Sequence, residues 1–140
     1  MACKKLKVFL DEQHVKYLTI QHSRAYTAQE IAESEHVSGN DFAKVVMLKI
    51  DGEMMMGVLP ASDKVELKLL RQKLDVGSVV FADENEFQDH FPGCEIGAMP
   101  PFGNLYGIRV IMAETLCGIH SISFNSGVHT EVVQMLSLIH

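Results

Sequence analysis

A hairpin signal in the middle of the chain constrains the fold more than any other feature of the sequence. Two nearly continuous apolar runs, residues 43–50 and 53–59, flank the dipeptide Asp51-Gly52. This dipeptide suits a two-residue turn between antiparallel strands, because both residue types tolerate positive φ angles. Strands that are apolar on both faces are usually covered on both faces. We therefore expect this hairpin at the centre of a sheet, with other elements packed on either side.

The segments around the hairpin alternate between helix and strand patterns. Helices are predicted at 3–13, from the capping-box residue Thr27 onward, at 63–74 and at 83–87. Further strands are predicted at 15–20, 78–81, 108–112, 120–124 and 132–135. This order lacks a regular βαβ alternation, which disfavours a Rossmann fold. It predicts an α/β, α+β-like fold with a mixed, mostly antiparallel sheet and helices packed outside.

The predicted helix at 63–74 is amphipathic. Ser62 or Asp63 is expected to be its N-cap. The residues expected to face the core are Leu67, Leu70 and Leu74. The whole chain, residues 1–140, is of a length that typically forms one domain.

The charge balance limits the kinds of partner. A net charge of −6 argues against sequence-independent binding to DNA or other nucleic acid through a broad basic surface. It leaves room for a small basic patch, and Lys64, Lys68 and Arg71 recur at i, i+4 and i+7 of the predicted helix. This stripe is either a solvated helix face or a strip that contacts phosphates.

Targeting signals and paired cysteines are missing from the sequence. No stretch approaches the roughly 20 apolar residues of a membrane span, and the N-terminal residues do not resemble a signal peptide. The three cysteines show no Cys-x-x-Cys spacing, which fits a reducing compartment. We expect a soluble, cytoplasmic protein with no membrane contact.

The segment Gly97-Ala98-Met99-Pro100-Pro101-Phe102-Gly103 has the composition of a stiff loop. Its prolines fix φ and donate no backbone hydrogen bond, and its glycines reach φ values that are closed to other residues. Backbone groups in such a loop are left free by any sheet and can hold a small ligand. The alternative is a surface turn closed by a buried Phe102.

Two side chains elsewhere suit a cleft. Lys44 opens an otherwise apolar strand, so its ammonium either reaches the sheet edge or lies in a pocket and meets a carbonyl or phosphate oxygen. His129 follows the turn 125–127 and precedes a strand, a place from which a side chain can enter a cleft or remain on the surface.

Metal and covalent chemistry have little support. The seven histidines are scattered, with no His-x-x-x-His or Cys-x-x-Cys pair, so no metal and no cofactor are expected. Cys117 with His120 is compatible with a thiol nucleophile, but no third, orienting group marks it, and a small buried cysteine is commoner.

Four motifs in order give the chain a resemblance to the YbaK family, which includes the editing insertion of bacterial prolyl-tRNA synthetases and free-standing trans-editing proteins. The motifs are His22-Ser23 with Thr27-Ala28-x-Glu30, then Ala43-Lys44-Val45-Val46-Met47-Leu48, then Glu95-Ile96 with the loop 97–103, and Asn125-Ser126-Gly127-Val128-His129-Thr130. The match runs over nearly the whole chain. The resemblance implies a single α/β domain around a mixed, partly barrel-like sheet.

The resemblance also implies an activity: an aminoacyl-tRNA deacylase that hydrolyses the ester joining a wrong amino acid to the 3′-terminal adenosine of a tRNA. Its implied catalytic residues are Lys44, Gly97 and His129. Its implied substrate-binding residues are His22, Tyr26, Thr27, Met47, Ala98, Met99, Pro100, Pro101, Phe102 and Gly127, with Lys64, Lys68 and Arg71 as tRNA phosphate contacts.

An aminoacyl ester is activated, so a positioned water and stabilisation of the developing oxyanion can suffice without a protein nucleophile. Family members differ in removing Ala, Cys, Ser or Thr, and the sequence does not choose among them. The acidic balance implies weak tRNA affinity unless an aminoacyl-tRNA synthetase or an elongation factor presents the substrate. The alternative is a non-catalytic module that binds a nucleotide, an aminoacyl group or a protein in the same cleft.

Overall fold

The computed structural model describes residues 4–14, 17–21, 42–91, 94–95, 97–116, 121–128 and 131–136. The helices are α1 (Lys4–Glu12), α3 (Leu67–Leu74) and α4 (Glu84–Phe87), with short 3-10 helices η1 (Gln88–His90), η2 (Gly103–Tyr106) and η3 (Glu114–Leu116). The strands are β1 (Tyr17–Gln21), β2 (Ala43–Ile50), β3 (Glu53–Pro60), β4 (Val79–Phe81), β5 (Arg109–Met112), β6 (Ser121–Asn125) and β7 (Glu131–Leu136). The predicted helix that starts at Thr27 lies outside the described residues.

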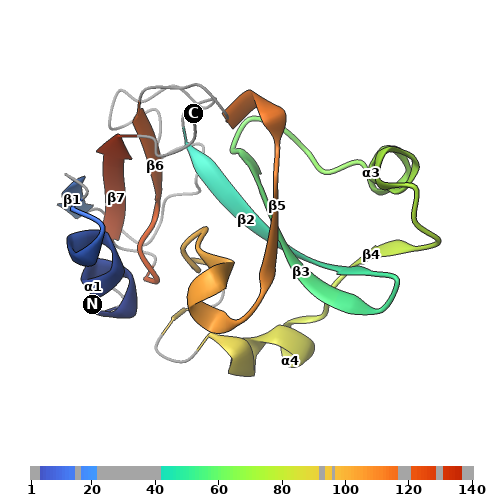
Figure 1. The fold of residues 1–140 in the computed structure, drawn as a ribbon, viewed down its shortest axis with the longest axis horizontal. Coiled ribbons are helices and arrows are strands. Elements are labelled where there is room, and N and C mark those ends of the chain that lie inside the picture. The colour runs from blue at the N-terminus through green and yellow to red at the C-terminus, as the bar shows by residue number, and fades with distance from the viewer. Residues whose placement is uncertain are drawn as a thin grey trace.

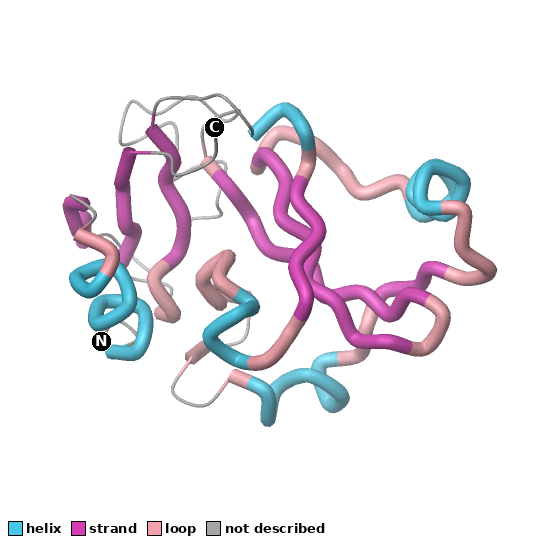
Figure 2. The backbone as a smooth tube through the Cα atoms, in the orientation of Figure 1, coloured by secondary structure: helices cyan, strands magenta, loops and turns pink. Residues whose placement is uncertain are grey.

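The strands form two sheets. One has the order β1-β7-β6 and is antiparallel throughout; the other has the order β4-β2-β3-β5, with a parallel pair only between β3 and β5. Figure 1 shows α1 beside the first sheet, α3 at the far side of the second, and η2 between the two. The tube in Figure 2 shows the same arrangement by secondary structure. This mixed, mostly antiparallel architecture with outer helices confirms the predicted fold class.

The central hairpin is confirmed in detail. β2 and β3 pair from Ala43 opposite Pro60 to Ile50 opposite Glu53. Both turn residues, Asp51 and Gly52, have positive φ angles of 49° and 84°, as a tight hairpin turn requires.

The hairpin is also covered on both faces, as predicted. On one face Met47 and Met56 belong to the main hydrophobic core, and on the other Leu48 and Met55 belong to a second cluster. Within the described residues, no helix has the length and apolar content to cross a membrane.

The two sheets meet beside the start of β2. Phe42 forms an isolated parallel bridge with Ser123 of β6. In the described part of the chain, this contact does not close the two sheets into a barrel. The predicted partly barrel-like character is therefore limited to this junction. The bridge matters for function because it places the beginning of β2 beside β6.

Helix α3 begins later than predicted. Asp63 donates its N–H to the Pro60 carbonyl at 3.0 Å, and its own carbonyl accepts a hydrogen bond from Lys44 Nζ. A helix that started at residue 63 would need this carbonyl for the N–H of Leu67. The helix therefore starts at Leu67 with Glu66 as its N-cap, and no side chain caps it.

The core-facing side of α3 is confirmed only in part. Leu67 and Leu70 pack half-buried against the second cluster, but Leu74 is 36% exposed. The prediction was wrong for Leu74 because it is the last residue of a helix that contributes no fully buried side chain.

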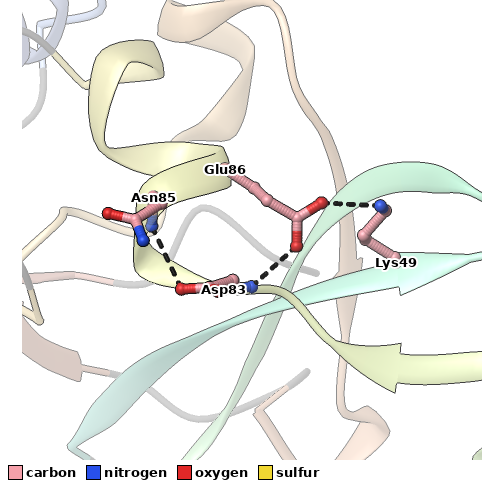
Figure 3. Close-up of polar contacts among 4 residues, drawn as sticks. All are labelled: Lys49, Asp83, Asn85 and Glu86. Carbon is pink, nitrogen blue, oxygen red and sulfur yellow. Dashed lines mark hydrogen bonds and ion pairs between the residues drawn. The ribbon is translucent and has the colours of Figure 1, made fainter.

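Helix α4 confirms the predicted acidic helix. Its N-terminus has a capping box in which Asp83 and Glu86 each accept a hydrogen bond from a backbone N–H, as Figure 3 shows. The Asn85 N–H donates to Asp83 Oδ1 at 3.2 Å, and the Asp83 N–H donates to Glu86 Oε1 at 3.0 Å. Lys49 Nζ of β2 lies 2.6 Å from the other Glu86 oxygen. The hydrogen bond from Lys49, together with the Asp83 N–H, holds the pKa of Glu86 below its ordinary value.

Candidate functional site

The loop at residues 97–103 packs into the core through Phe102, and its first residue, Gly97, is exposed. Gly97 is exposed with φ 86°, a conformation that favours glycine. Phe102 packs between Phe9 and Phe124, with ring centroids 5.6 and 5.4 Å apart. Phe102 is therefore half-buried and closes the loop by aromatic contacts, while the stiffness of the loop stays a prediction.

Within the described residues, the backbone N–H of Gly97 has only a weak partner. Its N–H points at Met99 Sδ at 3.2 Å, and a thioether sulfur is a poor acceptor. The next N–H, of Ala98, is already used by the Glu95 carbonyl at 3.0 Å. A ligand oxygen at Gly97 would replace a weak hydrogen bond with a stronger one.

The loop and the C-terminal turn are joined by a backbone hydrogen bond. The Glu95 N–H donates to the Gly127 carbonyl at 2.7 Å. Gly127 is buried, with φ 119°. The structure thus brings together two of the four sequence motifs, the loop at 97–103 and the turn at 125–128.

Lys44 lies half-buried at the start of β2, and Nζ donates to the Asp63 carbonyl. The ammonium meets a carbonyl oxygen, but this hydrogen bond is exposed, so the choice between the sheet edge and a pocket stays open. Side chains alternate along a strand, so Lys44 leaves β2 on the face opposite Met47, whose side chain lies in the core with Met99. That Lys44 faces the loop across a crevice stays a prediction.

The neighbouring strand places Lys44 nearer to the C-terminal turn. Phe42 and Ser123 form a parallel bridge, so β2 and β6 run in the same direction from there. Two residues on, Lys44 and Asn125 project from the same side of their strands. The β6–β7 hairpin end is therefore the neighbour that the Lys44 strand and the Gly97 loop share.

Four buried polar atoms at this hairpin have no hydrogen-bond partner within the described residues: Ser123 Oγ, Asn125 Oδ1, Ser126 Oγ and Glu131 Oε1. Sequence reasoning missed Ser123 and Glu131, and it assigned no role to Asn125 or Ser126. The sequence feature that could have identified these residues is a polar side chain on a strand whose other residues are mainly apolar.

The proposed substrate pocket is partly core. Met47, Ala98 and Met99 are buried, and Met47 and Met99 belong to the main cluster against which Phe102 packs. Pro100 and Pro101 are buried as well. His22, Tyr26, Thr27 and His129 lie outside the described residues, as do Cys117 and His120. Among the described residues, no three His, Cys, Asp or Glu side chains are grouped to hold a metal ion.

The predicted basic stripe is shorter than expected. Lys64 precedes α3, whereas Lys68 and Arg71 lie on it. These two line a shallow depression of about 400 Å³ together with Ser78 and strand β4. Neither has an ion-pair partner in the part of the chain that the structure describes.

Fold and site together define a mixed α/β protein in which the segment before a glycine-proline loop is hydrogen-bonded to a strand-end turn. Residues 22–138 match the family profile of the aminoacyl-tRNA editing domain, so the chain belongs to this family.

Individual relatives agree with this assignment. The chain is 28% identical over 116 residues to the prolyl-tRNA editing protein ProX of Acetoanaerobium sticklandii, covering 78% of this chain and 70% of that protein. The fold is similar to that of a crystal structure provisionally assigned as a trans-editing enzyme for prolyl-tRNA synthetase. That match has a TM-score of 0.76 and 16% identity and covers 94% of this chain and 83% of the other. A hypothetical protein of known crystal structure matches with a TM-score of 0.77 at 16% identity, over 94% and 87% of the two chains.

Proposed function

We propose that this protein hydrolyses mischarged aminoacyl-tRNA in trans, releasing a small amino acid such as Ala, Cys, Ser or Thr from the 3′-terminal adenosine. Membership of the editing-domain family supports this, and so does the similarity to a protein named for prolyl-tRNA editing. The observation that carries the proposal is the hydrogen bond between Glu95 and Gly127, which holds the segment before the loop against the turn and supports treating them as one site.

We assign the stabilisation of the developing oxyanion to the backbone N–H of Gly97. Water attacks the ester carbonyl, the carbonyl oxygen gains negative charge, and the bond to the ribose oxygen breaks to leave a free acid and a free hydroxyl. The exposed Gly97 N–H, bonded only to sulfur, is the donor available for the developing oxyanion. No protein nucleophile is needed, because the ester is activated.

Lys44 binds the 3′-end of the tRNA. Its ammonium is held by a neutral carbonyl, so its charge is not compensated by a carboxylate at that contact. A phosphate oxygen is a stronger partner for an ammonium than an amide carbonyl is. His129 is assigned to the pocket on the family resemblance alone.

We expect the site to select among amino acids by the size of their side chains. Met47 and Met99 belong to the core cluster against which Phe102 packs, and we propose that this packing leaves room only for small side chains at the loop. A hydrophobic pocket discriminates by only about 1–3 kcal/mol per methylene. The protein would therefore act as one sieve that accepts small groups and rejects larger ones.

The body of the tRNA is held more weakly. Lys68 and Arg71 beside Ser78 offer cationic and hydroxyl groups to backbone phosphates, with Lys64 just before the helix. On a chain of net charge −6 this gives low affinity, so we propose that a synthetase or an elongation factor delivers the substrate in the cytoplasm.

A panel of tRNAs charged with Ala, Cys, Ser or Thr tests the proposal. We expect release of at least one amino acid, and at least a tenfold slower release by Lys44→Ala. The matched control is Lys49→Ala on the same strand, whose ammonium is paired with Glu86. Undiminished release by Lys44→Ala would contradict the role of the lysine. No release from any substrate would contradict hydrolysis and favour the non-catalytic binding module.

A further inference from the structure

The buried polar atoms at the end of the β6–β7 hairpin share one chemical property. Asn125 Oδ1, Ser126 Oγ and Glu131 Oε1 can accept hydrogen bonds and have no hydrogen-bond partner within the described residues, although Glu131 Oε1 has an ion pair with Lys7. Buried polar groups in folded proteins nearly all have a partner. Ser126 and Glu131 project from one face of the hairpin and Asn125 from the other, and donors from a ligand or an ordered water would satisfy these atoms.

Ser126 and Glu131 form the core of this segment. The Ser126 N–H donates to the Glu131 carbonyl at 3.3 Å, which continues the pairing of Asn125 with Val132. Residues opposite each other in an antiparallel pair have Cβ atoms about 4.5–5.5 Å apart. Ser126 is 0% exposed and Glu131 is 6% exposed. A hydroxyl and a carboxylate thus leave the hairpin on the same face, out of bulk water and without a hydrogen bond between them.

One oxygen of the Glu131 carboxylate has a hydrogen bond, and the other has an ion pair with a lysine. Gln21 Nε2 of β1 donates to Oε2 at 2.6 Å. Lys7 Nζ of α1 lies 3.4 Å from Oε1, longer than the about 2.7–2.9 Å of a charge-assisted hydrogen bond. The Lys7 side chain is 37% exposed and has room to turn toward solvent. The position therefore attracts a cation but holds none by a hydrogen bond.

We propose that Ser126 and Glu131 bind the α-ammonium of the aminoacyl group. This inference rests on the proposed function and adds the part of the substrate that the hairpin recognises. An ammonium carries three N–H donors, which match the surplus of acceptors. The α-ammonium is attached to the carbon next to the ester carbonyl, and the Glu95–Gly127 hydrogen bond brings the Gly97 loop against the same turn. The site would thus select an unblocked amino acid.

A pair of non-hydrolysable ligands tests this inference without relying on catalysis. The probes are 3′-alanylamido-3′-deoxyadenosine and its N-acetyl derivative, with binding measured by calorimetry. We expect the wild-type protein to bind the free amine at least tenfold more tightly than the acetylated ligand. Glu131→Gln and Ser126→Ala are each expected to bring that ratio close to one.

The matched control is Glu53→Gln, which removes the same charge from an exposed carboxylate 3.4 Å from Arg109, and which should keep the preference. Circular dichroism reports whether each variant is folded. If Glu131→Gln does not fold, Ser126→Ala decides, because it removes only one hydroxyl.

Equal binding of the two ligands by the wild-type protein, or no binding of either, would overturn the inference and leave a buried water as the occupant. A preference for the free amine without any release from mischarged tRNA would support the ammonium site and contradict hydrolysis. Hydrolysis of mischarged tRNA without a preference for the free amine would support the proposed function and contradict the ammonium site.

Discussion

Helix α4 and the end of the β6–β7 hairpin differ in how their polar groups are partnered. At α4, the two carboxylates of Asp83 and Glu86 accept hydrogen bonds from backbone N–H groups and from Lys49, all close to the surface. At the hairpin end, oxygen atoms of Asn125, Ser126 and Glu131 are buried without a hydrogen-bond partner among the described residues, and Lys7 forms an ion pair with Glu131. The first arrangement stabilises the fold by itself, whereas the second is the one that we propose is completed by a bound ammonium.

The contrast extends to two lysines on one strand. The ammonium of Lys49 contacts a carboxylate, whereas the ammonium of Lys44 donates to a backbone carbonyl. A carboxylate compensates the charge of its lysine, but a carbonyl leaves it for another anion. Structures keep such incomplete polar groups where function requires them, since an unpartnered buried group costs stability.

The largest expected effect comes from two glycines with nearly the same backbone angle. Gly97 has φ 86° and Gly52 has φ 84°. An alanine in this region costs about 1–2 kcal/mol of folding stability at either position. Gly97→Ala also displaces the N–H that we assign to the oxyanion, and a misplacement of about 1 Å can lower the rate roughly 100-fold.

Steady-state deacylation and thermal unfolding of the two variants measure this difference. We expect similar losses of stability in both, but a large loss of kcat/KM only in Gly97→Ala. Because a Cβ at Gly52 would meet nothing within 4 Å, Gly52→Ala isolates the conformational cost. Equal activity in the two variants would show that the Gly97 N–H has no role in the reaction.

Sequence reasoning found the parts of the fold that are decided locally. The hairpin is specified by Asp51-Gly52 and by two apolar runs that adjoin it. The acidic helix is specified by Asp83, which caps the residues that follow it. Each of these signals lies within a few residues of the structure that it specifies, so periodicity and turn chemistry suffice.

The errors and omissions come from contacts between distant residues. The predicted start of α3 was wrong because residues 60–63 form a turn, with the Asp63 N–H on the Pro60 carbonyl and the Asp63 carbonyl on Lys44 of another strand. Glu131 was missed because a charged residue at a strand end is usually exposed, and only its place between Lys7 and Gln21 shows that it is buried. The candidate site was predicted as separate motifs, but the joining of Glu95 to Gly127 is a tertiary contact that no local pattern encodes.

Alanine substitutions at the two polar clusters should change stability in opposite directions. Asp83→Ala removes a helix N-cap and is expected to destabilise the protein by about 1 kcal/mol. Ser126→Ala removes a buried hydroxyl without a described partner, so we expect unchanged stability or a gain of up to about 1 kcal/mol. Urea unfolding of both variants measures this. A clear loss of stability in Ser126→Ala would mean that its hydroxyl is already satisfied in the free protein.

The smallest expected effect concerns the titration of Glu86. Lys49→Met removes the hydrogen bond that lowers the pKa of Glu86 most, so this pKa should rise toward its ordinary value of 4.5. A carboxyl whose folded pKa is lowered adds stability above its unfolded pKa and loses it as the pH falls through the folded pKa. The contribution of this exposed pair is therefore present at neutral pH and disappears in acid.

An NMR titration of the Glu86 carboxyl follows this change directly. Lys44→Met is the matched control, because it removes an ammonium from the same strand but not from Glu86, and it should leave the titration unchanged. If Lys49→Met left the pKa of Glu86 lowered, the Asp83 N–H alone would account for it. The α4 cluster would then hold its carboxylate through the helix cap, with Lys49 as free to find another anion as Lys44 is.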